Sequence, residues 1–178
     1  MTRTVQLITS GGQVLEGQIV LMEQRHFEDV EDIWKPILRA ANQPDAGWIW
    51  DYKLNQSQQQ ERYEAYSLDV DGLSQGLIFI ETQWHRSQLP QRWPLVYVEA
   101  IASAPWNRLP IEQPPWLRGI GRRLLTFARL RSVELGYGGR VGLHSLPNVE
   151  GFYQRLNMPD YGPDPEKDGL VYFEYGLI

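Results

Sequence analysis

The sequence predicts a single α/β domain built on one mixed, mostly antiparallel sheet with helices on both of its faces. Its 178 residues fit one domain, and 42% hydrophobic with 22% charged residues is close to the average of globular proteins. The patterns run as a β-meander followed by strand, helix, strand, helix and strand. A nearly continuous apolar run, LVYVEAIAS at 95–103, is typical of a central strand buried on both faces.

The N-terminal third predicts a hairpin followed by helices. Residues 1–22 alternate in polarity on either side of a Ser10-Gly11-Gly12 turn, which indicates an N-terminal β-hairpin. Apolar residues recur at helical spacing over 27–38, and Pro36 predicts either two short helices or one kinked helix there. The stretch 48–60 is expected as a helix that ends in a polar loop.

The rest of the chain is expected to alternate between strands and helices. The expected elements are strands over 63–70, 76–84 and 95–103, a helix over 119–135, a strand over 140–145, a helix over 148–156 and a strand over 170–175. We expect residues 1–178 to form one domain, to which the N-terminal hairpin is an extension.

Composition excludes several classes of function. With 17 Lys+Arg against 22 Asp+Glu the net charge is −5, which argues against a nucleic-acid partner. The absence of Cys excludes disulfides, a thiol nucleophile and a cysteine zinc site, and no metal is expected. No signal-peptide pattern and no apolar run of about 20 residues is visible, so we expect a cytoplasmic protein without a membrane partner.

The segment WLRGIGRRLL at 116–125 carries the clearest chemical signal. Gly119 and Gly121 leave the start of the predicted helix without side chains, so its backbone N–H groups are free to bind an anion. Three flanking arginines add positive charge: Arg118, Arg122 and Arg123. This pattern indicates a phosphate site, most naturally for the diphosphate of a nucleotide-like cofactor.

Two common phosphate motifs do not fit this segment. The dinucleotide fingerprint requires a third glycine where Leu124 stands, and the Walker motif requires Gly-Lys followed by Ser or Thr. The block 95–158 instead resembles the GNAT (Gcn5-related N-acetyltransferase) superfamily. Its acetyl-CoA motif, Gln/Arg-x-x-Gly-x-Gly/Ala, is matched at the two glycines, with Trp116 at the first position.

A second stretch, LPNVEGFYQRLNM at 146–158, resembles the second signature of the superfamily. Asn148 and Tyr153 match that signature, whereas Asn157 and Met158 replace its usual Gly and Phe. The resemblance implies that 95–158 is an acetyl-CoA-binding core in which the strands 95–103 and 140–145 splay apart. It implies acetyl-CoA as co-substrate, contacted by Ile101, Leu117, Arg118, Gly119, Ile120, Gly121, Arg122, Arg123, Asn148 and Tyr153.

The implied activity is direct attack of a primary amine on the acetyl thioester, which requires a base and an acid. The resemblance assigns the acid to Tyr153, although packing of that ring onto the sheet is the alternative. Glu99 is the first candidate for the base, because a carboxylate within an apolar strand is costly unless it is used or paired. Its alternative is an ion pair with Arg108. Glu81 is the second candidate, expected as a solvated strand-end residue, and a water chain is the third.

The remaining signals are weaker. His144, at the end of the strand 140–145, is expected to be a structural histidine with satisfied nitrogens. Trp34 is expected in the core, and Trp106 is a candidate for lining an acceptor pocket. The acceptor is expected to be an amine-bearing small molecule or protein, bound by a monomer or homodimer. A second hypothesis, motivated by Trp116 and Asn157, is a non-catalytic acyl-CoA-binding or interaction domain that keeps the fold.

Overall fold

The computed structural model describes residues 2–178. These residues form two compact units that share two strands. The first unit comprises the chain up to Phe79 together with Ala100–Leu124, and the second comprises Ile80–Glu99 with Leu125–Ile178. Within the described chain, no helix combines the length and the apolar character that a membrane crossing requires.

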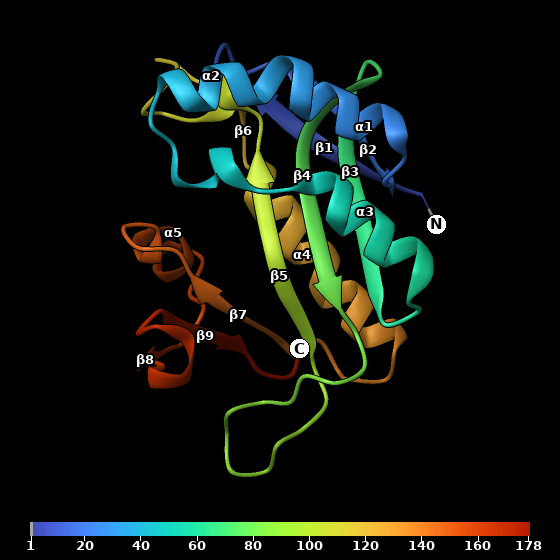
Figure 1. Ribbon diagram of the computed structural model, residues 1–178, viewed down its shortest axis with the longest axis vertical. Helices are drawn as coiled ribbons and strands as arrows, with labels where there is room; N and C mark the ends of the chain where they lie inside the picture. Colours follow the sequence, from blue (N-terminus) through green and yellow to red (C-terminus); the bar gives the residue numbers. More distant parts are fainter. Residues whose placement is uncertain (1) are drawn as a thin grey trace. The chain divides into compact units, whose positions relative to one another are not determined.

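The first unit is built on an antiparallel set of strands (Figure 1). The strand order is β6-β1-β2-β3-β4-β5. The bounds are β1 Arg3–Thr9, β2 Val14–Leu21, β3 Tyr63–Val70, β4 Leu73–Glu81, β5 Val96–Ser103 and β6 Leu117–Arg118. The predicted N-terminal hairpin is confirmed, because β1 pairs antiparallel with β2 from Arg3 opposite Ile19 to Ile8 opposite Val14. The other edge of β1 pairs with β6, a strand too short to be predicted.

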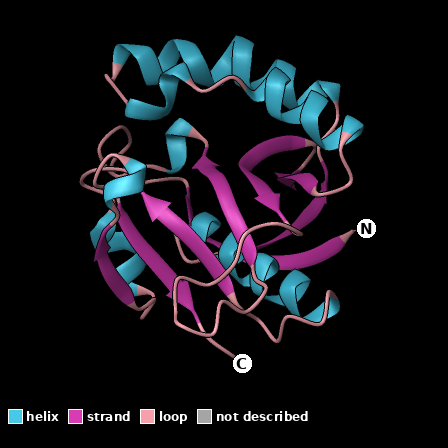
Figure 2. Cartoon of the chain, turned by 60° about the horizontal axis from the view of Figure 1, so that its bottom comes forward, coloured by secondary structure: helices cyan, strands magenta, loops and turns pink. Residues whose placement is uncertain are grey.

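Helices cover the first unit in a row that follows the hairpin. The row consists of α1 Gln24–Glu28, the π-helix η1 Asp29–Trp34, α2 Lys35–Ala40, the 3₁₀ turn η2 Pro44–Gly47 and α3 Trp50–Gln59. Figure 2 shows α1, η1 and α2 as a nearly continuous run of turns. The Lys35 N–H donates to the Val30 carbonyl, five residues back, so the chain passes into Pro36 through a widened turn. The predicted kink is therefore a π-helical turn.

The core of the first unit lies between these helices and one face of its strands. Trp34 is fully buried, as predicted, and packs edge-on against Trp106 at 6.3 Å between ring centroids. Leu77 and Phe79 of β4 belong to the same apolar cluster. Gly76 faces the opposite side, where a Cβ atom would lie 2.4 Å from Cγ2 of Ile120, the first residue of the helix α4 (Ile120–Glu134). Helices thus cover both faces of the strands, as the sequence predicts.

The second unit is a mixed sheet. The order β5-β7-β9-β8 brings in β7 Val141–Ser145, β8 Asp160–Pro163 and β9 Val171–Tyr175. The strands β5 and β7 pair in parallel over Val96–Val98 and Val141–Leu143, whereas β9 is antiparallel to both β7 and β8. Both β5 and β7 continue beyond this short parallel ladder, which agrees with the expected divergence of these strands. The unit also contains α5 Glu150–Arg155 and the 3₁₀ turn η4 Pro165–Lys167.

The helix α4, Ile120–Glu134, starts in the first unit and continues in the second. It ends one residue before its predicted limit, and Gly136 with φ +80° follows. The strand β4 begins three residues earlier than predicted and ends at Glu81, so residues 82–84 leave the sheet. The 3₁₀ turn η3, Pro105–Asn107, follows β5.

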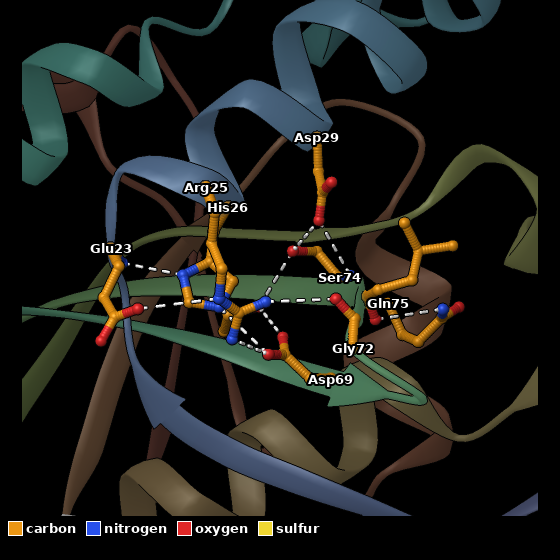
Figure 3. Close-up of polar contacts among 10 residues, drawn as sticks. Glu23, Arg25, His26, Asp29, Asp69, Gly72, Ser74 and Gln75 are labelled. Carbon is orange, nitrogen blue, oxygen red and sulfur yellow. Dashed lines mark hydrogen bonds and ion pairs between the residues drawn. The ribbon is translucent and has the colours of Figure 1, made fainter.

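A buried polar cluster in the first unit joins α1 to β3 (Figure 3). His26 is fully buried; its Nδ1 accepts the Glu23 N–H at 2.7 Å, and its Nε2 lies 3.0 Å from Oδ2 of Asp69. Arg25 reaches the same carboxylate oxygen at 2.6 Å, and Ser67 donates to the other oxygen. Burial alone would raise the pKa of Asp69, but the hydrogen bonds from His26, Ser67 and Arg25 outweigh it and lower the pKa to about 2.

Candidate functional site

The glycine-containing segment forms a sharp turn from β6 into α4. Gly119 has φ +86°, in the left-handed region that favours glycine, and it is exposed. The Arg123 N–H donates to the Gly119 carbonyl at 2.9 Å and closes the first turn of α4. The backbone amides that precede Arg123 are therefore the ones that an α-helix leaves without an intrahelical acceptor, as the sequence predicts. This helix start is suited to bind an anion.

A hydrogen-bond network anchors the approach to this turn. Oε1 of the buried Gln75 in β4 accepts from Trp106 Nε1 at 2.8 Å and from Asn107 Nδ2 at 2.9 Å. Oδ1 of Asn107 in turn accepts the Leu117 N–H at 2.9 Å. The Trp116 N–H donates to the Trp106 carbonyl at 2.9 Å. Trp106, which the sequence offered as a candidate for lining an acceptor pocket, thus packs against the core and helps to hold the segment that leads into α4.

The three predicted arginines at this segment are exposed. Arg118 lies on β6, one residue before the turn, and Arg122 lies in the first turn of α4. Arg123 donates from Nε to the Gln6 carbonyl on β1 at 3.0 Å, so this side chain also holds the sheet edge. The side chains of Leu117 and Ile120 are buried. The Leu117 N–H is taken by Asn107 Oδ1, whereas the Ile120 N–H lies at the start of α4, where an α-helix leaves its amides without an intrahelical acceptor. Ile101 on β5 is half-buried.

Glu99 lies on β5 in the second unit, but its surroundings differ from the expectation. Its side chain is exposed, so the expectation that its carboxylate is buried within an apolar strand is wrong. The expected alternative, an ion pair with Arg108, is also wrong. Within the first unit Arg108 forms a two-pronged pair with Asp45, at 2.8 and 2.6 Å, and it also donates to the Ser103 carbonyl.

Glu81 is not a solvated strand-end residue, because its side chain is fully buried. Its carboxylate accepts backbone N–H groups from Gln83 and Trp84 at 2.8 Å and from His85 at 2.9 Å, and His85 Nδ1 lies 2.8 Å away. Burial raises the pKa, but the hydrogen bonds from the His85 side chain and these amides outweigh it and hold the pKa at about 2. Glu81 therefore shapes the turn after β4 and is a poor base at neutral pH.

Tyr153 on α5 is buried in the second unit, with its ring 5.3 Å from that of Phe173. Burial raises its pKa, so the phenol keeps its proton at neutral pH. Within the described residues its hydroxyl has no hydrogen-bond partner. Asn148 is exposed in the turn before α5 and adopts φ 68°, a conformation that asparagine tolerates. The packing and the acid interpretations of Tyr153 are therefore compatible.

A second group of polar and aromatic side chains, which the sequence did not predict to meet, lies in the second unit. His144 Nδ1 lies 2.7 Å from the Tyr97 hydroxyl, and His144 Nε2 lies 2.9 Å from Oδ2 of Asp164. His85 stacks on Tyr97 with 3.9 Å between ring centroids. These side chains, together with Tyr172, line a cavity of about 350 Å³. Both nitrogens of His144 are bonded, as expected, but the residue also faces this cavity.

No spacing in the sequence marks this group, because its members come from β5, β7, β9, the loop after β4 and the segment before η4. The sequence matches no protein-family model and no curated protein. Solved structures, in contrast, share its fold.

A GNAT-family acetyltransferase from Listeria monocytogenes is 14% identical over 97% of this chain and 100% of its own, with a TM-score of 0.58. An N-acetyltransferase from Staphylococcus aureus is 14% identical over 91% and 99%, with a TM-score of 0.60. The PaiA N-acetyltransferase from Thermoplasma acidophilum, solved with coenzyme A, is 12% identical over 90% and 99%, with a TM-score of 0.62. The chain therefore has the GNAT fold.

Proposed function

We propose that this protein is an acetyl-CoA-dependent N-acetyltransferase that acetylates a primary amine. The observation that carries the proposal is the start of α4, where the left-handed Gly119 turns the chain and unpaired backbone amides meet three arginines. The GNAT fold supports the proposal, since the PaiA structure was solved with coenzyme A.

The donor would be held mainly by backbone. A diphosphate would accept from the amides of 119–122, since the Leu117 N–H of the expected segment is taken by Asn107, and the exposed arginines would supply countercharge. The pantetheine arm would pair with the backbone of 97–103, including Ile101, and Asn148 would contact the donor from the turn before α5. The bonds from Leu117 to Asn107 and from Asn107 to Gln75 hold the segment that leads into the turn before a ligand arrives, which lowers the ordering cost of binding.

The chemistry requires a proton donor for the departing thiolate. Tyr153 is suited to that role, because it is protonated at neutral pH and its hydroxyl is not engaged by another described side chain. Among the carboxylates that the sequence offered as base, the exposed Glu99 remains the candidate, whereas Glu81 is committed to its turn. A water chain remains the third possibility.

A non-catalytic acyl-CoA-binding domain is the second candidate function. Trp116, which replaces the Gln or Arg of the acetyl-CoA motif, is 38% exposed beside the helix start. Turnover separates the two functions, because a binding domain would bind acetyl-CoA but acetylate no amine.

The first experiment is a titration with acetyl-CoA followed by thermal unfolding, with ATP and NAD as control ligands. At 100 times its Kd, a ligand adds about 2.7 kcal/mol to the free energy of unfolding. Gly121→Glu should abolish the shift, because it places a side chain and a negative charge at the diphosphate amides. Gly47→Glu is the matched control: Gly47 is exposed, and a Cβ atom there meets no neighbour. A full shift with Gly121→Glu would reject this segment as the donor site.

The acid role is tested by Tyr153→Phe in assays that detect the CoA thiol with a panel of primary amines. We expect kcat to fall by about 100-fold with little change in acetyl-CoA affinity, since only the proton donor is lost. Unchanged turnover would remove Tyr153 from the chemistry.

A further inference from the structure

The cavity in the second unit contains a hydrogen-bonded chain with a defined direction. Burial raises the pKa of Tyr97, and the nearby charges of Glu99 and Asp164 raise it further, so the phenol remains protonated. Burial lowers the pKa of His144 despite its bond to Asp164, so the ring is neutral at neutral pH. Tyr97 therefore donates to His144 Nδ1, and His144 Nε2–H donates to Asp164.

This direction leaves the oxygen of Tyr97 as an acceptor. The phenol directs its O–H at His144 Nδ1, so a lone pair on Oη is available to an N–H group in the cavity. The neighbouring Tyr172 is not part of this series of hydrogen bonds, because its hydroxyl donates to the buried Glu174 at 2.6 Å. His85, fixed by Glu81, stacks on the Tyr97 ring and restricts it to this orientation. Tyr97 is thus a fixed acceptor for an amine or ammonium group.

The charges that line the cavity are balanced. Asp164 and Glu166 contribute two carboxylates, and Arg86 and Lys167 contribute two cations. Among the described residues, neither Lys167 nor Glu166 has an ion-pair partner. Glu99 lies two residues from Tyr97 on the same face of β5 and adds a negative charge near the phenol. A dication such as a polyamine would meet Lys167 and Arg86, whereas a ligand with one ammonium and one anionic group would satisfy both signs.

We propose that this cavity is the acceptor site of the proposed acetyl transfer, that it takes a small primary amine carrying an anionic group, and that Tyr97, His144 and Asp164 remove the proton from its ammonium. The proposal rests on the proposed function and deepens it. In this proposal the base is the hydrogen-bonded series of Tyr97, His144 and Asp164, in place of Glu99.

The proton transfer balances over the chain. The ammonium gives a proton to Tyr97 Oη while Tyr97 gives its own to His144 Nδ1, and the resulting imidazolium is paired with the Asp164 carboxylate. The neutral amine then forms a C–N bond to the thioester carbonyl carbon, and the C–S bond breaks. The thiolate takes a proton from Tyr153, which regains one from the amine nitrogen through solvent, and His144 releases the first proton to solvent.

Binding is tested without turnover by NMR of ¹⁵N-labelled protein, whose three histidines give few imidazole signals. The probes are γ-aminobutyrate and putrescine, which differ in one terminal group. We expect γ-aminobutyrate to shift the His144 signals, assigned with His144→Asn, at a Kd at least tenfold below that of putrescine. Lys167→Glu, at an exposed position, should reverse the preference. Unmoved His144 signals, or a stronger response to putrescine in the native protein, would overturn the acceptor site.

The role of Tyr97 is tested by Tyr97→Phe, which keeps the ring stacked on His85. We expect kcat/KM to fall by about 100-fold or more. We also expect the acid limb of its pH profile to move from the range of His144 toward the amine pKa near 10, which a merely structural role would not cause. Tyr161→Phe, an exposed tyrosine, is the matched control.

The groups that face His144 are Tyr97 and Glu99 on β5, His85, Asp164, Lys167 and Tyr172. A wild-type pH profile in Tyr97→Phe, with loss of the acid limb in Glu99→Gln, would overturn the role of Tyr97 and assign the base to Glu99. Amine binding without turnover in any variant would reject the proposed function but keep the site. Turnover with unmoved His144 signals would keep the function and reject the site.

Discussion

Acid should destabilise the first unit through Asp69. Its pKa is 3.8 as a free side chain and about 2 in the folded protein, where the carboxylate is 8% exposed. At about 1.4 kcal/mol per pKa unit, this difference contributes about 2–3 kcal/mol to the free energy of unfolding. Because the folded pKa is the lower one, the contribution is complete above pH 5 and is lost as the pH falls from about 4 toward 2.

The assay is urea unfolding followed by tryptophan fluorescence at intervals from pH 7 to pH 3. Asp69→Asn should lower the free energy of unfolding at pH 7 by about 3 kcal/mol, since it removes one partner of a buried pair. It should also flatten the dependence between pH 4 and pH 3, because one carboxylate no longer takes up a proton on unfolding.

The matched control is Asp71→Asn in the exposed turn after β3. Asp71 has φ 51°, which asparagine also adopts, so this change should leave both the stability and its pH dependence within about 0.5 kcal/mol of the native values. If the pH curves of Asp69→Asn and the native protein are parallel, the hydrogen bonds of His26, Ser67 and Arg25 do not hold the carboxylate as described.

Two further variants test packing around the helix start. Arg108→Met should lower the free energy of unfolding by about 3 kcal/mol, because it leaves the buried Asp45 charge without its pair. Adding Asp45→Leu to this variant should recover stability in urea titrations. An unchanged urea midpoint in Arg108→Met alone would contradict this reasoning. Gly76→Ala should cost about 1–3 kcal/mol, because its Cβ meets Ile120, and the added effect of Ile120→Ala should be less than additive. Additive losses would show that the two residues are not in contact.

The long elements were predictable because their own patterns determine them. The strand over 63–70 and the helix near 119–135 carry periodic apolar patterns, and the strand near 95–103 is a nearly continuous apolar run. Their observed bounds differ from the predicted ones by at most one residue at each end. The short strands β6 and β8 have two and four residues and contain no such pattern, so they depend on their partners β1 and β9.

The burial of the two glutamates illustrates what a one-dimensional pattern omits. An apolar run predicts that both faces of β5 are covered, yet Glu99 is exposed while its neighbours Val98 and Ala100 are buried. Glu81 was expected in solvent because it ends a strand, but the following residues fold back and direct their amides at it. The sequence does contain a signal for this turn, because Glu81 at the strand end is followed four residues later by His85, which bonds to it.

The cluster at His144 could not have been predicted, because its partners lie 47 and 20 residues away along the chain. Only the parallel register of β5 with β7 and the return of the chain before η4 bring them together. In contrast, Gly119 signals the turn into α4 locally, since a turn into a helix is determined by adjacent residues.

The pairing of β1 with β6 has a consequence for synthesis of the chain. Ile8 faces Arg118 across this pair, so the outer edge of the first strand stays open until the ribosome has added 110 more residues. At about 5–20 residues per second, that interval is roughly 5–20 s, during which an uncovered strand edge is available to other nascent chains. The segment that closes the edge also leads into the turn at Gly119, where we propose that phosphate binds. Protection from aggregation and assembly of the proposed donor site therefore occur in the same folding step.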